Sequence, residues 1–203
     1  DGKVEGYSIG IYGSWMPEQN KGPYIDLWGH YAWYDNQLSG AAQSHTSKYD
    51  SSGYALSAEI GYGFEINRHE DGSAWILEPH AQVIYSHLQA DNFYDSYGTW
   101  YSNNQASGYQ TRLGARLYGQ LATDQKGVTP FIELNWLHNN VDNGVQLNGM
   151  ALNSDIGRNV GEVKIGVQGE LTERLSTWGH IGLQHGSESF KRYEIQLGLG
   201  WQW

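Results

Sequence analysis

The stretch that decides the fold is the C-terminal one, IQLGLGWQW, at residues 195–203. Read at every second position, it places Ile195, Leu197, Leu199, Trp201 and Trp203 on one side of an extended chain, with glutamine and glycine on the other. A period of two is typical of a β-strand that has one apolar and one polar face. The stretch therefore predicts a strand, and the rest of the sequence has to say what its apolar face contacts.

The composition suits a membrane boundary, because the 203 residues include 15 Tyr, 9 Trp and 27 Gly. Tyr and Trp carry an apolar body with a polar tip, which favours membrane–water interfaces. The sequence has no run of about 18 apolar residues, so a transmembrane helix is excluded. A transmembrane barrel is still compatible with the sequence, because alternation lowers the mean hydropathy of each strand.

Charge and cysteine content exclude other classes of protein. The chain has no cysteine, so it offers neither a disulfide framework nor a thiolate metal site. Its net charge of −10 argues against nucleic acid as a partner, since a phosphate-binding surface needs clustered Lys and Arg. Residues 1–10 lack the basic and apolar regions of a signal peptide, and we expect that the targeting segment has been removed or that the chain begins within a longer protein.

The alternation recurs in nine segments of the chain. They lie at about 4–16, 23–36, 53–66, 74–88, 108–121, 132–136, 162–171, 175–184 and 192–203. Most are at least as long as the roughly ten residues that a tilted strand needs to cross a bilayer. No segment shows a competing helical period, so the sequence predicts an all-β protein.

The connections between these segments sort by length. The stretches 17–22, 67–73, 122–127 and 172–174 are short, whereas 37–52, 89–107 and 139–159 are long and polar, and only the final hairpin at 186–189 breaks the rule. Long loops at one end and tight turns at the other are typical of outer-membrane barrels, whose turns are periplasmic. We therefore predict a transmembrane antiparallel up-and-down β-barrel.

The polar face of the strands supports the same interpretation. It carries Asp26, Glu59, Glu65, Glu78, Glu133, Glu162, Glu170 and Glu194 beside Arg112, Arg116, Lys164 and Arg192. A soluble barrel would expose these charges and pack many Trp and Tyr rings inside, which a core of this size accommodates poorly. Turned inside out, the pattern gives a lipid-facing apolar band around a hydrated lumen.

Four stretches carry a resemblance to a known family. They are EPHAQVIYSHLQADNF (78–93), YQTRLGARLYGQL (109–121), TPFIELNWLHNN (129–140) and NVGEVKIGVQGELTERLSTWGHIGLQHGS (159–187). Together they resemble the C-terminal translocator domain of autotransporters, nearest the AIDA-like adhesin branch, over essentially the whole chain. The resemblance implies type V secretion, in which a barrel in the Gram-negative outer membrane exports an N-terminal passenger, often an adhesin or other virulence factor, to the cell surface.

The resemblance also implies that part of the barrel lies upstream. The family barrel is twelve-stranded with a helix in the lumen, and VEGYSIGIYGSWM (4–16) resembles its fourth strand. An odd number of strands conflicts with the even numbers of bacterial single-chain barrels, and it would leave two edges unpaired in lipid. We therefore expect residues 1–203 to form a single barrel domain that lacks its first three strands.

The ending resembles the family's signal for outer-membrane assembly. Its residues here are Gln196, Gly198, Trp201 and Trp203. The resemblance implies the barrel-assembly machine as a partner, beside outer-membrane lipid, lipopolysaccharide and the protein's own passenger.

The inward charges suggest a ladder that orders the pore and holds a plug rather than a catalytic site. We assign this lumen charge ladder to Glu59, Glu78, Arg112, Arg116, Glu133, Lys164 and Arg192. Some members of the family cleave their own passenger linker with lumenal acids, and Glu59, Glu78 and Glu133 are the candidates for that chemistry here. We expect no enzyme activity from this chain.

Other kinds of site find less support. His30, His80 and His180 point inward but lie on different strands without H-x-H spacing, so we expect neither a metal nor another cofactor. A passive porin or a barrel protease is the alternative function, the latter with His87 and Asp91, or His185 and Glu188, near the long-loop rim.

Overall fold

The structure is a computed structural model that describes residues 2–17, 21–39, 46–94, 98–102, 105–122, 125–143, 145–147, 150–152, 158–187 and 190–202. The regular elements within these ranges are all β-strands. No described segment is a helix long and apolar enough to cross a membrane. The main sheet contains β1 (Gly2–Trp15), β2 (Gly22–Ser39), β3 (Thr46–Arg68), β4 (Ala74–Ala90), β7 (Gln105–Gln120), β8 (Gly127–Asn143), β11 (Asn159–Glu170), β12 (Leu175–Gly186) and β13 (Lys191–Trp201).

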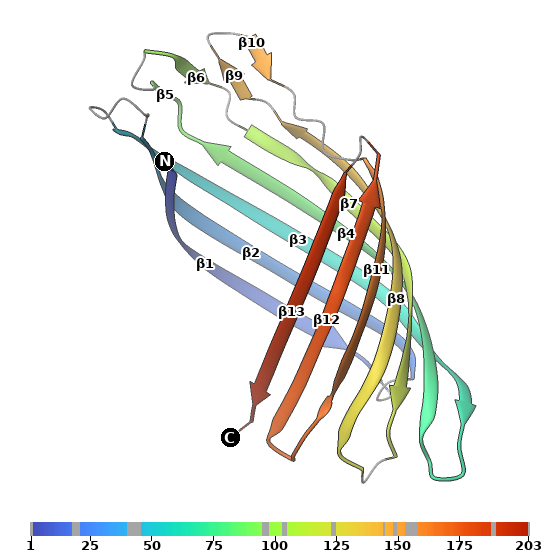
Figure 1. Cartoon of the computed structure of the whole chain (residues 1–203). Helices are drawn as coiled ribbons and strands as arrows, with labels where there is room; N and C mark the ends of the chain where they lie inside the picture. Colours follow the sequence, from blue (N-terminus) through green and yellow to red (C-terminus); the bar gives the residue numbers. More distant parts are fainter. Residues whose placement is uncertain are drawn as a thin grey trace.

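The main sheet has nine strands in the order β1-β2-β3-β4-β7-β8-β11-β12-β13. Every neighbouring pair is antiparallel, as consecutive hairpins require. The sheet curves into a half-barrel, with β1 (blue) and β13 (red) at its two edges (Figure 1). The all-β antiparallel fold and its nine strands, predicted from the alternation, are confirmed.

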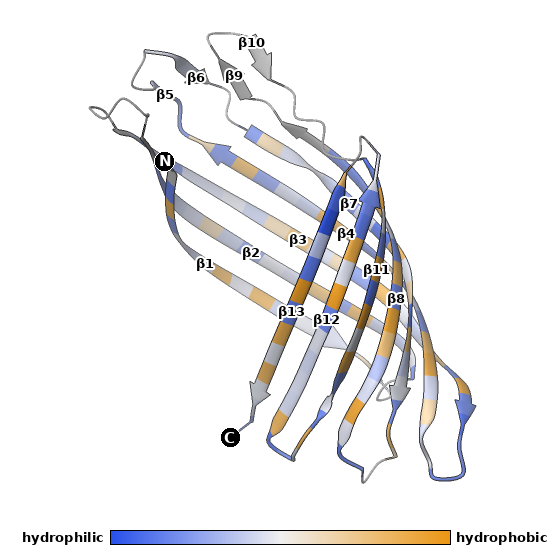
Figure 2. Cartoon of the chain, in the orientation of Figure 1, coloured by the Kyte–Doolittle hydropathy of each residue, from blue (hydrophilic) through white to orange (hydrophobic). Residues whose placement is uncertain are grey.

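The two faces of the sheet differ in the way that the alternation predicts. Apolar side chains on the outer face are exposed, for example Ile9 at 67% and Leu197 at 84%. Buried side chains of the inner face include the polar Glu133, Asn135 and Glu162. Along the strands, apolar and polar residues alternate (Figure 2). A face of this kind is stable only against lipid, because water would not tolerate so many exposed apolar side chains side by side.

The apolar core is correspondingly small. Among the described residues, four buried side chains on the inner face form an apolar cluster, namely Ala74, Ile76, Tyr118 and Phe131. They come from β4, β7 and β8, near the end of the sheet that carries the short turns. Apolar packing on the inner face therefore lies near that end of the sheet, while polar contacts dominate the middle of the inner face.

The β3–β4 turn shows how the short connections are built. The backbone N–H of His69 donates to the carbonyl of Ser73 at 2.8 Å, and Gly72 adopts φ of 88°, which favours glycine. Asp71 Oδ1 accepts hydrogen bonds from the backbone N–H of Ser73 at 2.9 Å and from its hydroxyl at 2.6 Å. These donors lower the pKa of the Asp71 carboxyl.

The long connections contain more regular structure than the sequence predicts. The strands extend into the expected loops, β2 to Ser39, β3 back to Thr46 and β8 to Asn143. The loops also form a second sheet of four short strands, in the order β10-β9-β6-β5. These are β5 (Phe93–Tyr94), β6 (Trp100–Ser102), β9 (Val145–Leu147) and β10 (Met150–Leu152), at the top of Figure 1.

The expected bounds of the long loops, 37–52, 89–107 and 139–159, were therefore too wide, and parts of these loops are strands. Alternating hydropathy reports contact with lipid, and it stops where lipid stops, whereas backbone pairing continues into water wherever a partner strand is available. Stacked aromatic rings connect the extended β3 to the second sheet. The ring centroid of Phe93 lies 4.2 Å from that of Tyr49 and 4.6 Å from that of Tyr101.

Candidate functional site on the inner face of the sheet

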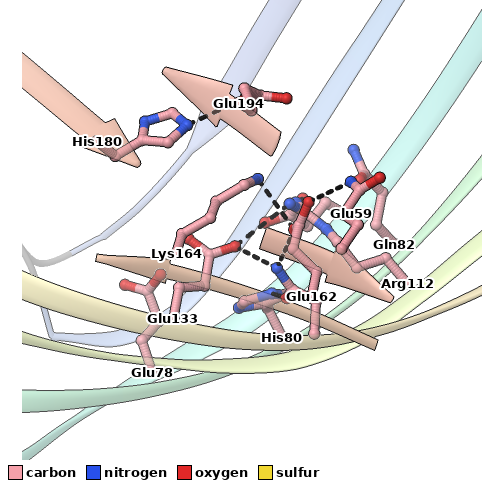
Figure 3. Close-up of polar contacts among 12 residues, drawn as sticks. Glu59, Glu78, His80, Gln82, Arg112, Glu133, Glu162, Lys164, His180 and Glu194 are labelled. Atoms are coloured by element: carbon pink, nitrogen blue, oxygen red, sulfur yellow. Dashed lines mark hydrogen bonds and ion pairs between the residues drawn. The ribbon is translucent and has the colours of Figure 1, made fainter. Parts of the chain in front are cut away.

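The centre of the inner face is an ion-pair group that joins three strands. Arg112 on β7 donates from Nη2 to Glu59 Oε2 on β3 at 2.6 Å, and its Nη1 lies 3.5 Å from Glu133 Oε1 on β8. Between 11% and 22% of each of these side chains is exposed. The guanidinium thus bridges two carboxylates that lie on opposite sides of its own strand (Figure 3).

Asn135 on β8 connects this group to the next strands. Its Nδ2 donates to Glu133 Oε1 at 2.7 Å and to Glu162 Oε1 at 2.8 Å, while its Oδ1 lies 2.9 Å from His80 Nε2. Glu162 also accepts from Gln184 Nε2 at 2.5 Å and pairs with Lys164 at 3.1 Å. A buried amide with these partners satisfies several polar groups that would otherwise be costly to bury.

Glycine at position 114 makes the contact between His80 and Asn135 possible. In the strand register, Gly114 on β7 pairs with His80 on β4 and with Asn135 on β8. A Cβ at Gly114 would overlap with Asn135 Oδ1, His80 Nε2 and the carbonyl of Leu134. The absence of a side chain therefore lets the two neighbouring strands exchange a hydrogen bond across β7.

Two members of the predicted charge ladder are in register but form no ion pair. Glu78 on β4 lies opposite Arg116 on β7. Glu78 instead accepts hydrogen bonds from the hydroxyls of Tyr24 at 3.4 Å and Tyr118 at 3.2 Å. Arg116 Nη2 donates to Gln168 Oε1 on β11 at 2.5 Å.

A separate group of three inward side chains lies near the β13 edge. His180 Nε2 lies 3.1 Å from Glu194 Oε1, and Arg192 Nη2 lies 3.7 Å from Glu194 Oε2. The structure thus brings Glu59, Arg112 and Glu133 together, places Lys164 beside them through Glu162, and leaves Arg192 apart.

Each of the three inward histidines contacts a different residue. His80 contacts Asn135, His180 contacts Glu194, and the ring of His30 stacks on Trp28 at 5.5 Å. Within the described ranges, no group of three or more His, Cys, Asp or Glu is arranged to hold a metal. Of the rim residues considered for a protease, His87 packs against Tyr54 at 5.5 Å, and Glu188 lies outside the described residues.

The residues that resemble an assembly signal lie on β13. Gln196 and Gly198 face inward, and Trp201 on the outer face is 60% exposed. A Cβ at Gly198 would overlap with the indole of Trp178, so the ring of the neighbouring strand covers this glycine. Trp203 lies outside the described residues.

The sequence interpretation missed Asn135, Tyr24 and Tyr118 as members of the site. All three are buried and contact the predicted carboxylates directly. The alternation places Asn135 on the polar face, but nothing in the sequence marks it as the residue that joins two carboxylates. Tyr24 reaches Glu59 at 2.9 Å and Glu78 only because Gly61 between them has no side chain, which is a tertiary effect.

Taken together, an outward apolar band and an inward wall of paired charges define a transmembrane sheet of the outer-membrane barrel class. The chain belongs to the autotransporter beta-domain family, whose model matches residues 1–182. It is therefore a Gram-negative outer-membrane domain, as the resemblance implied.

Two curated relatives illustrate the match. The uncharacterized protein YuaQ of Escherichia coli (strain K12) is 34% identical over 98% of this chain. The autotransporter adhesin AIDA-I of Escherichia coli is 29% identical over 97% of it. The chain spans only 15% and 16% of the lengths of these two proteins.

A solved structure shows the same architecture. The crystal structure of the transport unit of the autotransporter AIDA-I from Escherichia coli superimposes with a TM-score of 0.85 at 27% identity. The match covers 100% of this chain and 67% of that one.

Proposed function

We propose that this chain is the greater part of a translocator domain that anchors a passenger in the outer membrane and helps to export it to the cell surface. The observation that carries the proposal is the inner wall itself, where carboxylates, amides and guanidinium groups are linked around a curved sheet of the autotransporter beta-domain family. Such a wall stays hydrated and gives an unfolded polypeptide few apolar surfaces to adhere to. Several of its charges are paired with one another, as Glu59 is with Arg112 and Glu162 with Lys164.

We propose further that three strands upstream of β1 complete the barrel. The open edges support this proposal, because each unpaired N–H or C=O group costs several kcal/mol in hydrocarbon. The match to about two thirds of the AIDA-I transport unit supports it as well, since the remaining third supplies chain for further strands. Twelve strands would satisfy the even number found in bacterial single-chain barrels.

The partners of the domain follow from the same function. We propose that the barrel-assembly machine inserts the domain through β13, and that the outer face contacts lipopolysaccharide in the outer leaflet. The aromatic ending with Gln196, Gly198 and Trp201 supports the first of these partners. The outward aromatic rings of Tyr54, Tyr85 and Tyr109, among which Tyr85 contacts the other two, support the second, since such belts lie at membrane interfaces.

The test of export uses the full-length protein in its own host or in an outer-membrane-competent strain. We expect that externally added protease removes the upstream region from intact cells while the β-domain stays in the outer-membrane fraction. A matched protein in which β13 is deleted is expected to keep that region inside the cell. Equal surface exposure with and without β13 would contradict the proposed export. Ion conductance with no exposed upstream region would favour the porin alternative.

A further inference from the structure

We propose that the outer face of the hairpin between β12 and β13 binds a phosphate group of lipopolysaccharide through Lys191 and His185. This inference rests on the proposed function, because it assigns a position to the lipid partner of the outer face. Its starting point is the uneven distribution of charge around the long-loop end of the sheet. The hairpin lies at that end (Figure 1), which is extracellular in outer-membrane barrels.

Lys191 and His185 are neighbours on the outer face. They are paired in register, Lys191 at the start of β13 and His185 near the end of β12. Lys191 alternates with Tyr193 and Ile195, which are 77% and 75% exposed, so all three side chains point outward. Residues that lie directly opposite in an antiparallel pair have Cβ atoms roughly 5 Å apart. An ammonium group and an imidazole N–H can therefore reach the same phosphate.

Both side chains are accessible to a ligand. Both are exposed, and within the part of the chain that the structure describes neither forms an ion pair or a side-chain hydrogen bond. At the long-loop end of β11, β12 and β13, the described outward positions hold Asn159, Gly161, His185 and Lys191, and no carboxylate. An anionic ligand therefore meets no like charge there, and its bonds to Lys191 are charge-assisted.

Two exposed aromatic rings place the pair at the depth of a lipid headgroup. Tyr193 follows Lys191 on the same face, and Trp136 on β8, which is 47% exposed, shares a register row with Gly161 and His185. Outward Tyr and Trp rings mark the boundary between hydrocarbon and water. A lysine just beyond that boundary keeps its methylene groups against lipid and its ammonium group among the headgroups.

The same arrangement favours a phosphorylated sugar over a free anion. Gly161 has no side chain, so nothing on β11 separates Trp136 from His185, a span of roughly 10 Å across two strand spacings. A sugar of the headgroup can pack against the Trp136 ring while its phosphate contacts His185 and Lys191. A soluble phosphate gains nothing from the ring or from the depth. The outer leaflet of the Gram-negative outer membrane supplies such a sugar in lipopolysaccharide.

The other edge of the sheet carries the opposite charge at the same end. Glu5 on β1, Asp35 on β2 and Asp50 on β3 share one register row on the outer face, and Lys3 pairs with Glu5 at 2.8 Å. These carboxylates repel a phosphate. A general attraction of the rim to anionic lipid would not sort the charges in this way, so the proposed contact is local to the β13 side.

The experiment measures the binding of lipid A to the purified full-length protein in detergent micelles by native mass spectrometry. One probe carries both phosphates, and the other has lost both. We expect the phosphate-free probe to bind more weakly. Lys191→Gln is expected to raise the Kd for the phosphorylated probe about tenfold, as the loss of a charge-assisted hydrogen bond implies. It should leave the Kd for the phosphate-free probe unchanged, and Lys191→Arg should keep most of the affinity.

Lys3→Gln is the matched control, because it removes an outward cation from the same end of the sheet that is already paired with Glu5. An unchanged Kd in Lys191→Gln, an equal loss in Lys3→Gln, or equal binding of the two probes would each overturn the proposal. Phosphatidylglycerol that binds as tightly as lipid A, or displacement of lipid A by inorganic phosphate, would overturn the assignment to lipopolysaccharide. If Lys191→Gln does not fold, His185→Gln decides, with an expected phosphate-dependent loss of about threefold.

Surface exposure of the upstream region, measured by protease on intact cells, separates this site from the proposed function. An unexposed upstream region in the unmodified protein means that the proposed function is wrong. An exposed region together with lipid A binding that ignores Lys191 means that only the phosphate site is wrong.

Discussion

At the scale of single residues, Arg112 joins three strands through one guanidinium group. Replacing it with Gln leaves Glu59 and Glu133 without their shared cation, so we expect the free energy of unfolding to fall by about 1–3 kcal/mol. The loss can be measured by urea titration of the purified full-length protein in detergent, with the heat-modifiable gel mobility of the barrel as the signal. Arg112→Gln combined with Glu59→Gln should recover part of the loss, and simple additivity of the two changes would contradict the pairing.

The assignment of side chains on β11 and β12 to the outer or inner face of the sheet gives a second prediction for single residues. Ile165 is 57% exposed on the outer face, whereas Gln184, on the paired β12, faces Glu162 on the inner side. Arginine at position 165 is expected to cost about 2–4 kcal/mol near the bilayer midplane. Gln184→Arg should cost far less, because the new guanidinium meets the Glu162 carboxylate. Equal losses in the same urea titration would mean that the two faces are assigned the wrong way round.

Asp71 in the β3–β4 turn links stability to pH. Its folded pKa is lowered by the Ser73 hydroxyl and backbone N–H, so its contribution is fully present above the unfolded pKa of about 3.9 and is lost as the pH falls through the folded pKa. We expect Ser73→Ala to be less stable than the unmodified protein near neutral pH. The two proteins should converge in acid, below both pKa values. A stability difference that stays constant from pH 7 to acid would contradict this origin.

At the scale of elements, glycines set which side chains of neighbouring strands meet. Gly166 on β11 pairs with Phe131 on β8 and with His180 on β12, and a Cβ at this position would overlap with both side chains. The ring centroids of Phe131 and His180 lie 6.3 Å apart across the missing side chain. The same principle operates at Gly114, so inward glycines turn separate hairpins into one connected wall.

The C-terminal strand β13 gives the prediction at this scale. We expect deletion of Trp203, or Trp201→Ser, to lower the amount of barrel in the outer membrane and to leave chains that periplasmic proteases degrade. The prediction rests on the resemblance of the ending to the family's assembly signal. One exposed ring by itself adds little to the apolar area that contacts lipid. Outer-membrane fractionation and the gel mobility of unheated samples measure both effects. Leu199→Ala is a suitable control, because it removes apolar area from the same face without changing the aromatic pattern, and an equal loss there would argue against a signal.

At the scale of the whole molecule, the half-barrel has two edges that lipid does not tolerate. Single cysteines along Tyr193–Gln202 test what covers the β13 edge, and residues 1–203 contain no cysteine. In the mature full-length protein we expect disulfides with cysteines placed in the upstream region of the same polypeptide, which indicates a closed barrel. Before closure, we expect adducts with the barrel-assembly machine. A monomeric species that is stable in detergent and forms neither adduct would contradict both expectations.

The sequence by itself determined which residues face lipid and which face the lumen. A strand has a period of two, so one apolar position such as Leu197 fixes the orientation of every other residue in its segment. The family likewise follows from the sequence, because the motifs at 78–93 and 159–187 are long and occur in the expected order. The second sheet does not, since its strands of two or three residues are too short to show a period.

Only the tertiary structure decided how the inward residues pair. Register predicts that Arg116 meets Glu78 or Glu133, its direct neighbours, yet the guanidinium contacts Phe131 and Gln168 instead. The partner of Arg116 depends on which side chains on the next two or three strands are already occupied by other contacts. No local sequence pattern carries that information. Alternation gives the direction of a side chain, whereas curvature, stagger and the positions of glycines decide what it touches.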